Sequence, residues 1–154
     1  MQLALYQPDI PQNTGALCRL GACLNMCVHI IHPTGFVYSE KKFRRAAMDY
    51  ADHVHMHEHD SFEAFDNWRK PAGKRLVLLS TKAENSVYEF SFTASDILLL
   101  GRESAGVPQK IADQCDARLR IPMAPNRRSM NVAVAAALAI GEAKRQTDGF
   151  RDLT

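Results

Sequence analysis

Two short stretches place charged and polar side chains where a folded chain would present them to a ligand. In the first, Arg127 and Arg128 precede Ser129 and Asn131, and an almost wholly apolar segment follows from 132 to 140. Ser129 and Asn131 stand where a helix would begin, and a helix N-terminus presents free N–H groups and partial positive charge. The pattern indicates a ligand-binding loop anchored to a buried helix. The alternative is an ordinary capped core helix with a surface loop before it.

The second stretch is GRESAGVP, residues 101–108, in which Glu103 lies between two glycines. Gly101 and Gly106 permit positive φ or close backbone approach, both typical of ligand loops. The alternative is a plain turn with a solvated glutamate. No GxGxxG motif follows the first apolar strand and no P-loop lysine motif occurs, which disfavours the usual dinucleotide and nucleoside triphosphate chemistry.

A basic cluster indicates a third kind of chemistry, the binding of a phosphate backbone. Lys41, Arg44 and Arg45 are spaced i, i+3 and i+4, so on a helix they share one face. The pair Arg127–Arg128 could extend this patch, which suits a nucleic acid. The alternative is a solvated charged face. The net charge is only +2, so any basic surface must be local.

Four alternating histidines, His53, His55, His57 and His59, resemble a row of metal ligands. In an extended strand all four side chains would point to one side. Side chains at positions i and i+2 of a strand are nearly 7 Å apart, however, so neighbouring histidines would not easily bind the same ion. No cysteine or carboxylate cluster is placed to complete a site. We therefore predict no metal.

The apolar pattern places these residues on an α/β scaffold. Predicted strands cover 3–6, 27–33, 54–57, 75–81, 96–101 and 118–121, and predicted helices cover 13–25, 39–50, 61–68, 108–115 and the segment from 132 onward. Alternating strands and helices indicate a mostly parallel sheet flanked by helices, with ligands beyond the carboxyl ends of the strands. That rule singles out three loops: Ser80–Lys82, Gly101–Pro108 and Pro122–Ser129. The segment 132–140 lacks a polar face, which predicts burial on more than one side.

Composition sets the outer limits. A chain of 154 residues, 46% apolar and 23% charged, is typical of one globular domain over 1–154 with a substantial core. The sequence has no signal-peptide pattern and no apolar run long enough to span a membrane. The cysteines Cys18, Cys23, Cys27 and Cys115 have neither zinc-ribbon spacing nor disulfide density. We expect a cytoplasmic protein with no membrane partner.

Three ordered segments together resemble the SPOUT superfamily of RNA methyltransferases, specifically its small TrmL/YibK-type members. They are IPQNTGALCRL, with Asn13 and Arg19; LLLGRESAGVP, with Glu103; and RIPMAPNRRSMNVAVA, with Ser129 and Asn131. CVHIIHPTGF and KKFRRAAMDY extend the likeness over nearly the whole chain. Three motifs in order at family spacing are far more specific than any one loop.

The resemblance implies an α/β knot with a C-terminal trefoil, forming a homodimer with the knot region at the interface. It implies that S-adenosylmethionine is bound by Leu79, Gly101, Ile121, Met123 and Ser129. TrmL-type members methylate the ribose 2′-hydroxyl of the wobble nucleotide, cytidine or a modified uridine, of leucine tRNAs. Because the chain has no room for the extra RNA-binding domain of many relatives, the dimer surface is expected to recognise tRNA. That surface includes Lys41, Arg44, Arg45, Arg127 and Arg128.

Catalytic roles carried over from the family fall on five residues. Arg19 would be the base, but a guanidinium is almost never deprotonated, so it could instead clamp a phosphate while Ser129 or solvent relays the proton. Asn13 would orient Arg19 or the ribose, Glu103 would fix the RNA or the arginine, and Asn131 would hold its loop. Two alternatives stay open. One is a non-catalytic RNA-binding or ribosome-assembly factor; the other is a SPOUT methyltransferase acting on ribosomal RNA or at another tRNA position.

Overall fold

The computed structural model describes residues 1–39 and 55–153. The predicted helix at 39–50, with Lys41, Arg44 and Arg45, lies outside the described residues except for its first position, and so does His53. Of the described residues, no helix is long and apolar enough to cross a membrane.

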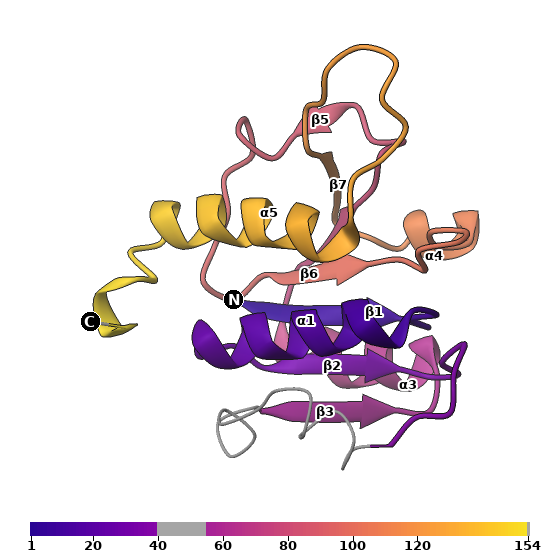
Figure 1. Ribbon diagram of the computed structural model, residues 1–154. Coiled ribbons are helices and arrows are strands. Elements are labelled where there is room, and N and C mark those ends of the chain that lie inside the picture. Colours follow the sequence, from indigo (N-terminus) through magenta and orange to yellow (C-terminus); the bar gives the residue numbers. More distant parts are fainter. Residues whose placement is uncertain (40–54, 154) are drawn as a thin grey trace.

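A parallel sheet of seven strands, ordered β3-β2-β1-β6-β4-β7-β5, forms the centre of the molecule (Figure 1). The strands are β1 (Gln2–Tyr6), β2 (Val28–Ile31), β3 (Met56–His59), β4 (Leu76–Leu79), β5 (Asn85–Ser86), β6 (Ile97–Leu100) and β7 (Ala117–Arg120). The predicted parallel sheet is therefore confirmed. Only β5 has no predicted counterpart, because two polar residues carry no periodicity. The connection 80–84 joins β4 to β5, yet β7 lies between these two strands and pairs with both.

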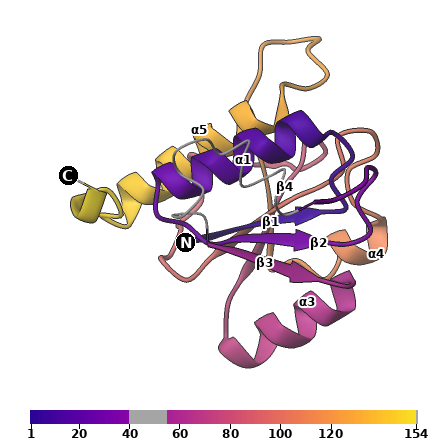
Figure 2. The same cartoon turned by 60° about the horizontal axis from the view of Figure 1, so that its bottom comes forward.

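Helices cover both faces of the sheet. They are α1 (Pro11–Cys23), α3 (Phe62–Arg69), α4 (Gln109–Ala112) and α5 (Val132–Gln146), with the 3₁₀ turns η2 (Lys70–Ala72) and η3 (Arg151–Leu153). Figure 2 shows α1 and α5 side by side on one face and α3 with α4 on the other. Strands covered on both faces are apolar at every position, which explains the continuous runs in β4 and β6.

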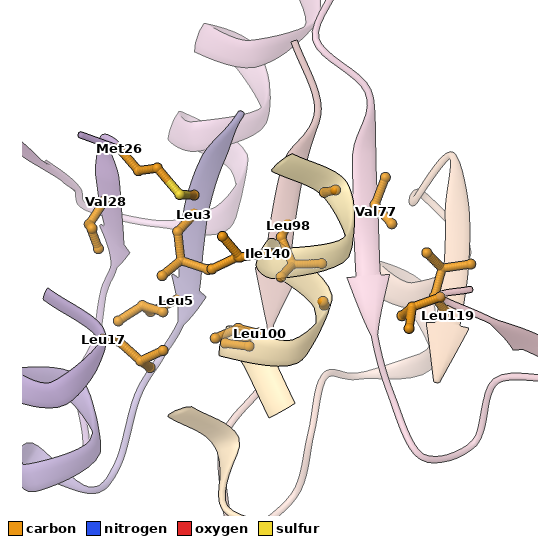
Figure 3. Packing of buried hydrophobic residues seen from close by; sticks show 14 of the residues in the cluster. Leu3, Leu5, Leu17, Met26, Val28, Val77, Leu98, Leu100, Leu119 and Ile140 are labelled. Carbon is orange, nitrogen blue, oxygen red and sulfur yellow. The ribbon is translucent and has the colours of Figure 1, made fainter. Parts of the chain in front are cut away.

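The core is divided by the sheet into two layers, and β1 supplies both. Leu3 and Leu5 face α1 and α5, whereas Ala4 and Tyr6 pack on the α3 side. Figure 3 shows Ile140 of α5 between the side chains of β1 and β6. Each fully buried large apolar side chain stabilises the fold by roughly 1.5–3 kcal/mol, so the sheet is a rigid base for the loops at its edge.

Helix α5 is buried on one side only within this chain. Ala136, Ala139 and Ile140 are fully buried, but Val134 is 53% and Leu138 41% exposed. The prediction of burial on more than one side is therefore wrong for the single chain. The reason is geometric: α5 packs on α1 and β6, and no described element covers its opposite face.

Candidate active site

A cavity of about 840 Å³ opens where β4 and β6 end. All three loops singled out by the sheet rule contribute to its wall: Ser80–Ala83 after β4, Gly101–Val107 after β6, and Met123, Ser129 and Met130 between β7 and α5. Ile10 and Asn13 close it from the start of α1. Because parallel strands end at one edge, loops far apart in sequence meet there.

The glycines of the second loop shape one wall of the cavity. Arg102 and Gly106 exchange backbone hydrogen bonds of 3.0 and 2.8 Å, which closes a tight turn. A Cβ on Gly101 would lie 2.6 Å from the carbonyl carbon of Gly106, and Gly106 itself has φ +69°. A side chain at the first position has no room, and one at the second is strained. The turn therefore brings backbone to the cavity surface.

A directed chain of hydrogen bonds links all three motifs. The Oδ1 of Asn131 accepts from the N–H groups of Ala133 (2.9 Å) and Val134 (3.3 Å), capping α5. Its Nδ2 must then donate, and it does so to Oδ1 of Asn13 at 2.9 Å. The Nδ2 of Asn13 in turn donates to Oε1 of Glu103 at 3.1 Å. The orientation of a side-chain amide is assigned from its hydrogen-bond network. Here the N–H groups of α5 fix the orientation of the Asn131 amide, which in turn fixes that of the Asn13 amide.

Glu103 is held from its other side by Asp9. The N–H of Asp9 donates to Oε2 of Glu103 (3.1 Å), and the N–H of Glu103 donates to Oδ1 of Asp9 (3.0 Å). The other Asp9 oxygen accepts from the backbone and hydroxyl of Ser104. Both Glu103 oxygens therefore have donors within the chain, which favours positioning of the loop over a contact with RNA.

The pKa values of Asp9 and Glu103 are shifted in opposite directions by this arrangement. Hydrogen bonding with Glu103, and then with Ser104, holds the pKa of Asp9 well below its ordinary value despite partial burial. Burial, followed by the neighbouring Asp9 carboxyl, raises the pKa of Glu103. Asp9 therefore carries the firmer negative charge of the pair, with Nε of Arg102 3.6 Å from its Oδ2.

The structure brings together most of the residues predicted for the site. Those that line the cavity are Asn13, Leu79, Gly101, Glu103, Ile121, Met123, Ser129 and Asn131. Arg19 is not among the described lining residues: it is exposed on α1, and it stands about 120° round the helix from Asn13. Arg127 and Arg128 are exposed on the third loop but are not in the cavity lining.

Asp9 is the participant that sequence reasoning missed. It follows β1 at the same edge of the sheet as the three selected loops. The carboxyl-end rule, applied to the first strand as well, would have pointed to residues 7–10. What hid it is that a single aspartate between two prolines is typical of any surface turn.

Two of the alternating histidines, His57 and His59, pack with His29 beside α3. His29 is fully buried, with its Nδ1 2.9 Å from Nε2 of His59 and its ring 4.6 Å from that of Trp68. Burial, followed by the neighbouring His59 and His57, lowers the pKa of His29 to about 3. Among the described residues no group of three His, Cys, Asp or Glu side chains could hold a metal ion.

Known proteins match the chain over nearly its whole length. A Beijerinckia indica protein named tRNA (cytidine(34)-2'-O)-methyltransferase is 57% identical over 144 residues, which cover 94% of this chain and 90% of that protein. An Escherichia coli protein of the same name is 38% identical over 148 residues, covering 95% and 93% of the two chains.

Solved structures are also similar to this chain over nearly its whole length. One described as "Structural insights into the 2-OH methylation of C/U34 on tRNA" has a TM-score of 0.87 and 44% identity, covering 94% of both chains. The SpoU methyltransferase AviRb from Streptomyces viridochromogenes, in complex with AdoMet, has a TM-score of 0.84 and 28% identity, covering 95% of this chain and 60% of that one. The model of the SpoU rRNA Methylase family matches residues 1–141. The chain therefore belongs to this family, and its predicted place among TrmL-type SPOUT methyltransferases is confirmed.

Proposed function

We propose that this protein transfers a methyl group from S-adenosylmethionine to the ribose 2′-hydroxyl of nucleotide 34 of tRNA, with leucine tRNAs as substrates. The observation that carries the proposal is the convergence of all three motif segments, far apart in the sequence, on one cavity. The names of relatives that match more than nine-tenths of the chain support the substrate.

The cavity suits the cofactor in size and in chemistry. Its volume of about 840 Å³ lies in the range of small-molecule sites, and the backbone brought forward by Gly101 and Gly106 offers donors and acceptors without side chains in the way. We assign cofactor binding to five residues that line the cavity: Leu79, Gly101, Ile121, Met123 and Ser129. When bound, the cofactor supplies an electrophilic sulfonium methyl group.

The chain's own residues must then align the hydroxyl and remove its proton. Asn13 presents a fixed amide at the cavity wall, and Ser129 offers a hydroxyl that can relay the proton to solvent. Alignment contributes several kcal/mol to lowering the barrier, and a positioned proton acceptor adds roughly 10²–10⁴-fold. We assign Arg19 to clamping the RNA phosphate, because its guanidinium stays protonated.

A homodimer accounts for two features of the single chain. Val134 and Leu138 leave exposed apolar side chains one turn apart on α5, and a second copy would cover them. Helix α1 lies beside α5 (Figure 2). Arg19 is exposed on the neighbouring helix, outside its own cavity, so a symmetric dimer could deliver it to the partner's site.

The position of β7 between β4 and β5 supports the trefoil knot at this end. We place the protein in the cytoplasm, where tRNA is modified, without a metal.

The test is methyl transfer to tRNA and to ribosomal RNA, with 2′-O-methyl sites mapped on the products, together with calorimetry of AdoMet binding. We expect binding and a mark at position 34 of leucine tRNAs. Binding without transfer to any RNA would contradict the enzyme and favour an RNA-binding factor. A mark on ribosomal RNA alone would contradict the substrate.

Arg19→Ala tests the delivery across the dimer. We expect this variant and Ser129→Ala each to be inactive alone. After subunit exchange in an equal mixture we expect up to about a quarter of the activity, because half of the dimers are then mixed and each mixed dimer carries one intact site out of two. No recovery after verified subunit exchange would mean that Arg19 acts in its own chain.

A further inference from the structure

Asp9 joins three neighbouring loops although it belongs to none of the three motifs. We propose that Asp9 is a positioning residue that holds the Gly101–Gly106 turn in its ligand-ready shape. It does so by a reciprocal clasp with Glu103 and Ser104. The assignment of that turn to the methyl donor rests on the proposed function, but the clasp itself does not.

The clasp consists of two reciprocal hydrogen bonds between Asp9 and Glu103, which are 94 positions apart in the sequence. Each of Asp9 and Glu103 donates its backbone N–H to the other's carboxylate, over 3.1 and 3.0 Å. Ser104 adds its N–H, 3.4 Å away, and its hydroxyl to the second Asp9 oxygen. One hydrogen bond would leave the turn free to rotate. Charge-assisted bonds at two points set both its distance and its orientation.

The opposite side of Asp9 is held as firmly. The N–H of Gly35 donates to the carbonyl of Pro8 over 2.9 Å. A Cβ on Gly35 would lie 2.6 Å from the Asp9 Cβ, so the loop after β2 packs directly on Asp9. In the sheet β1 lies between β2 and β6. Asp9, in the loop after the middle strand β1, therefore connects the loop after β6 to the loop after β2.

Asp9→Asn is the decisive variant, because it keeps the size of the side chain. The substituted side chain keeps only one oxygen acceptor. If that oxygen accepts from the N–H of Glu103, the new NH₂ group faces the two donors of Ser104. If the amide flips, the oxygen accepts from Ser104 and the contact with the N–H of Glu103 is lost. Ser104→Ala removes a single donor, and Asp60→Asn is a matched control on the exposed turn after β3. The readouts are amide hydrogen exchange of residues 102–106 without cofactor, AdoMet affinity by calorimetry, and the thermal midpoint.

For Asp9→Asn we expect exchange at Glu103 and Ser104 to rise about tenfold and AdoMet affinity to fall about tenfold. The thermal midpoint and exchange in the sheet strands should stay near those of the parent protein. Ser104→Ala should give a smaller change in the same direction, and Asp60→Asn none.

Unchanged exchange in Asp9→Asn would overturn the clasp, and faster exchange with unchanged AdoMet affinity would overturn its positioning role. If the parent protein itself bound no AdoMet, the proposed function would fail, while the exchange data would still judge the clasp. If Asp9→Asn did not fold, Ser104→Ala would decide, since unchanged local exchange there would equally overturn the proposal.

Discussion

Asn131 donates a side-chain hydrogen bond to the amide oxygen of Asn13 over 2.9 Å, although 118 positions separate them. The contact joins the first turn of α1 to the cap of α5. Because Asn131 also accepts from the N–H groups of α5 and Asn13 also donates to Glu103, neither amide can flip without loss. Substitutions along this chain of contacts are therefore expected to be non-additive.

Replacing Asn131 can separate its capping role from its contact with Asn13. Asn131→Ala should lower the free energy of unfolding by about 1 kcal/mol through the lost cap and should also lower methyl transfer. Asn131→Asp keeps an acceptor for the α5 N–H groups but cannot donate to Asn13, so stability should be retained while activity falls. Urea unfolding and initial rates check this. Equal activity in Asn131→Asp and the parent would contradict a role for the donor.

The two glycines of the β6 loop should differ in their tolerance of a side chain. Gly101→Ala places a Cβ 2.6 Å from backbone that cannot move away easily, whereas Gly106→Ala meets nothing within 4 Å and carries only the strain of φ +69°. We expect Gly106→Ala to cost about 1 kcal/mol with measurable AdoMet binding, and Gly101→Ala to abolish binding. Calorimetry checks both. An inverted order would contradict the structure of the turn.

Arg127 and Arg128 are expected to contact RNA phosphates. Each alanine substitution should weaken tRNA binding and reduce the slope of log affinity against log salt by about 1, while leaving AdoMet affinity unchanged. Filter binding between 50 and about 200 mM salt measures it. Lys70→Ala, on the turn after α3, is the matched control. A slope unchanged in both arginine variants would remove them from the interface.

The protein should lose stability as pH falls below neutrality because of His29. In the folded state the pKa of His29 is about 3 against an ordinary 6.5, so between these values the unfolded chain binds the additional proton. Stability is then full above pH 6.5 and falls as pH drops, by about 2 kcal/mol by pH 5. Urea midpoints at pH 7.5 and 5 check this, and His29→Phe should flatten the difference. An identical pH dependence in His29→Phe would contradict the assignment.

Loss of the Arg75–Asp96 pair should destabilise the fold strongly. Asp96 is fully buried and accepts from Nε and Nη2 of Arg75, both at 2.7 Å, and from Thr93. Burial opposes its charge, but these hydrogen bonds outweigh burial and lower its pKa. Asp96→Asn should cost about 3 kcal/mol, whereas the exposed Asp113→Asn should leave the unfolding midpoint unchanged. Equal effects of the two variants would contradict this.

The elements of the fold were largely readable from local pattern. Continuous apolar runs predicted β4 and β6 because strands covered on both faces have no polar side. A polar residue marked the start of two of the helices, as the caps Ser61 and Asn131 show. The predicted edge loops, with Gly101 and Ser129, also followed from local residues and one topological rule.

Tertiary structure decided the contacts between these elements. Asp9 and Glu103 are 94 positions apart, so no local pattern could pair them. The exposure of Arg19 and Leu138 likewise depends on how α1 and α5 pack together. Local sequence determines which residues prefer a strand, a helix or a tight turn, because those preferences act within a few residues. Which carboxylate meets which N–H, and which helix face stays uncovered, is set only when the sheet brings distant segments to one edge.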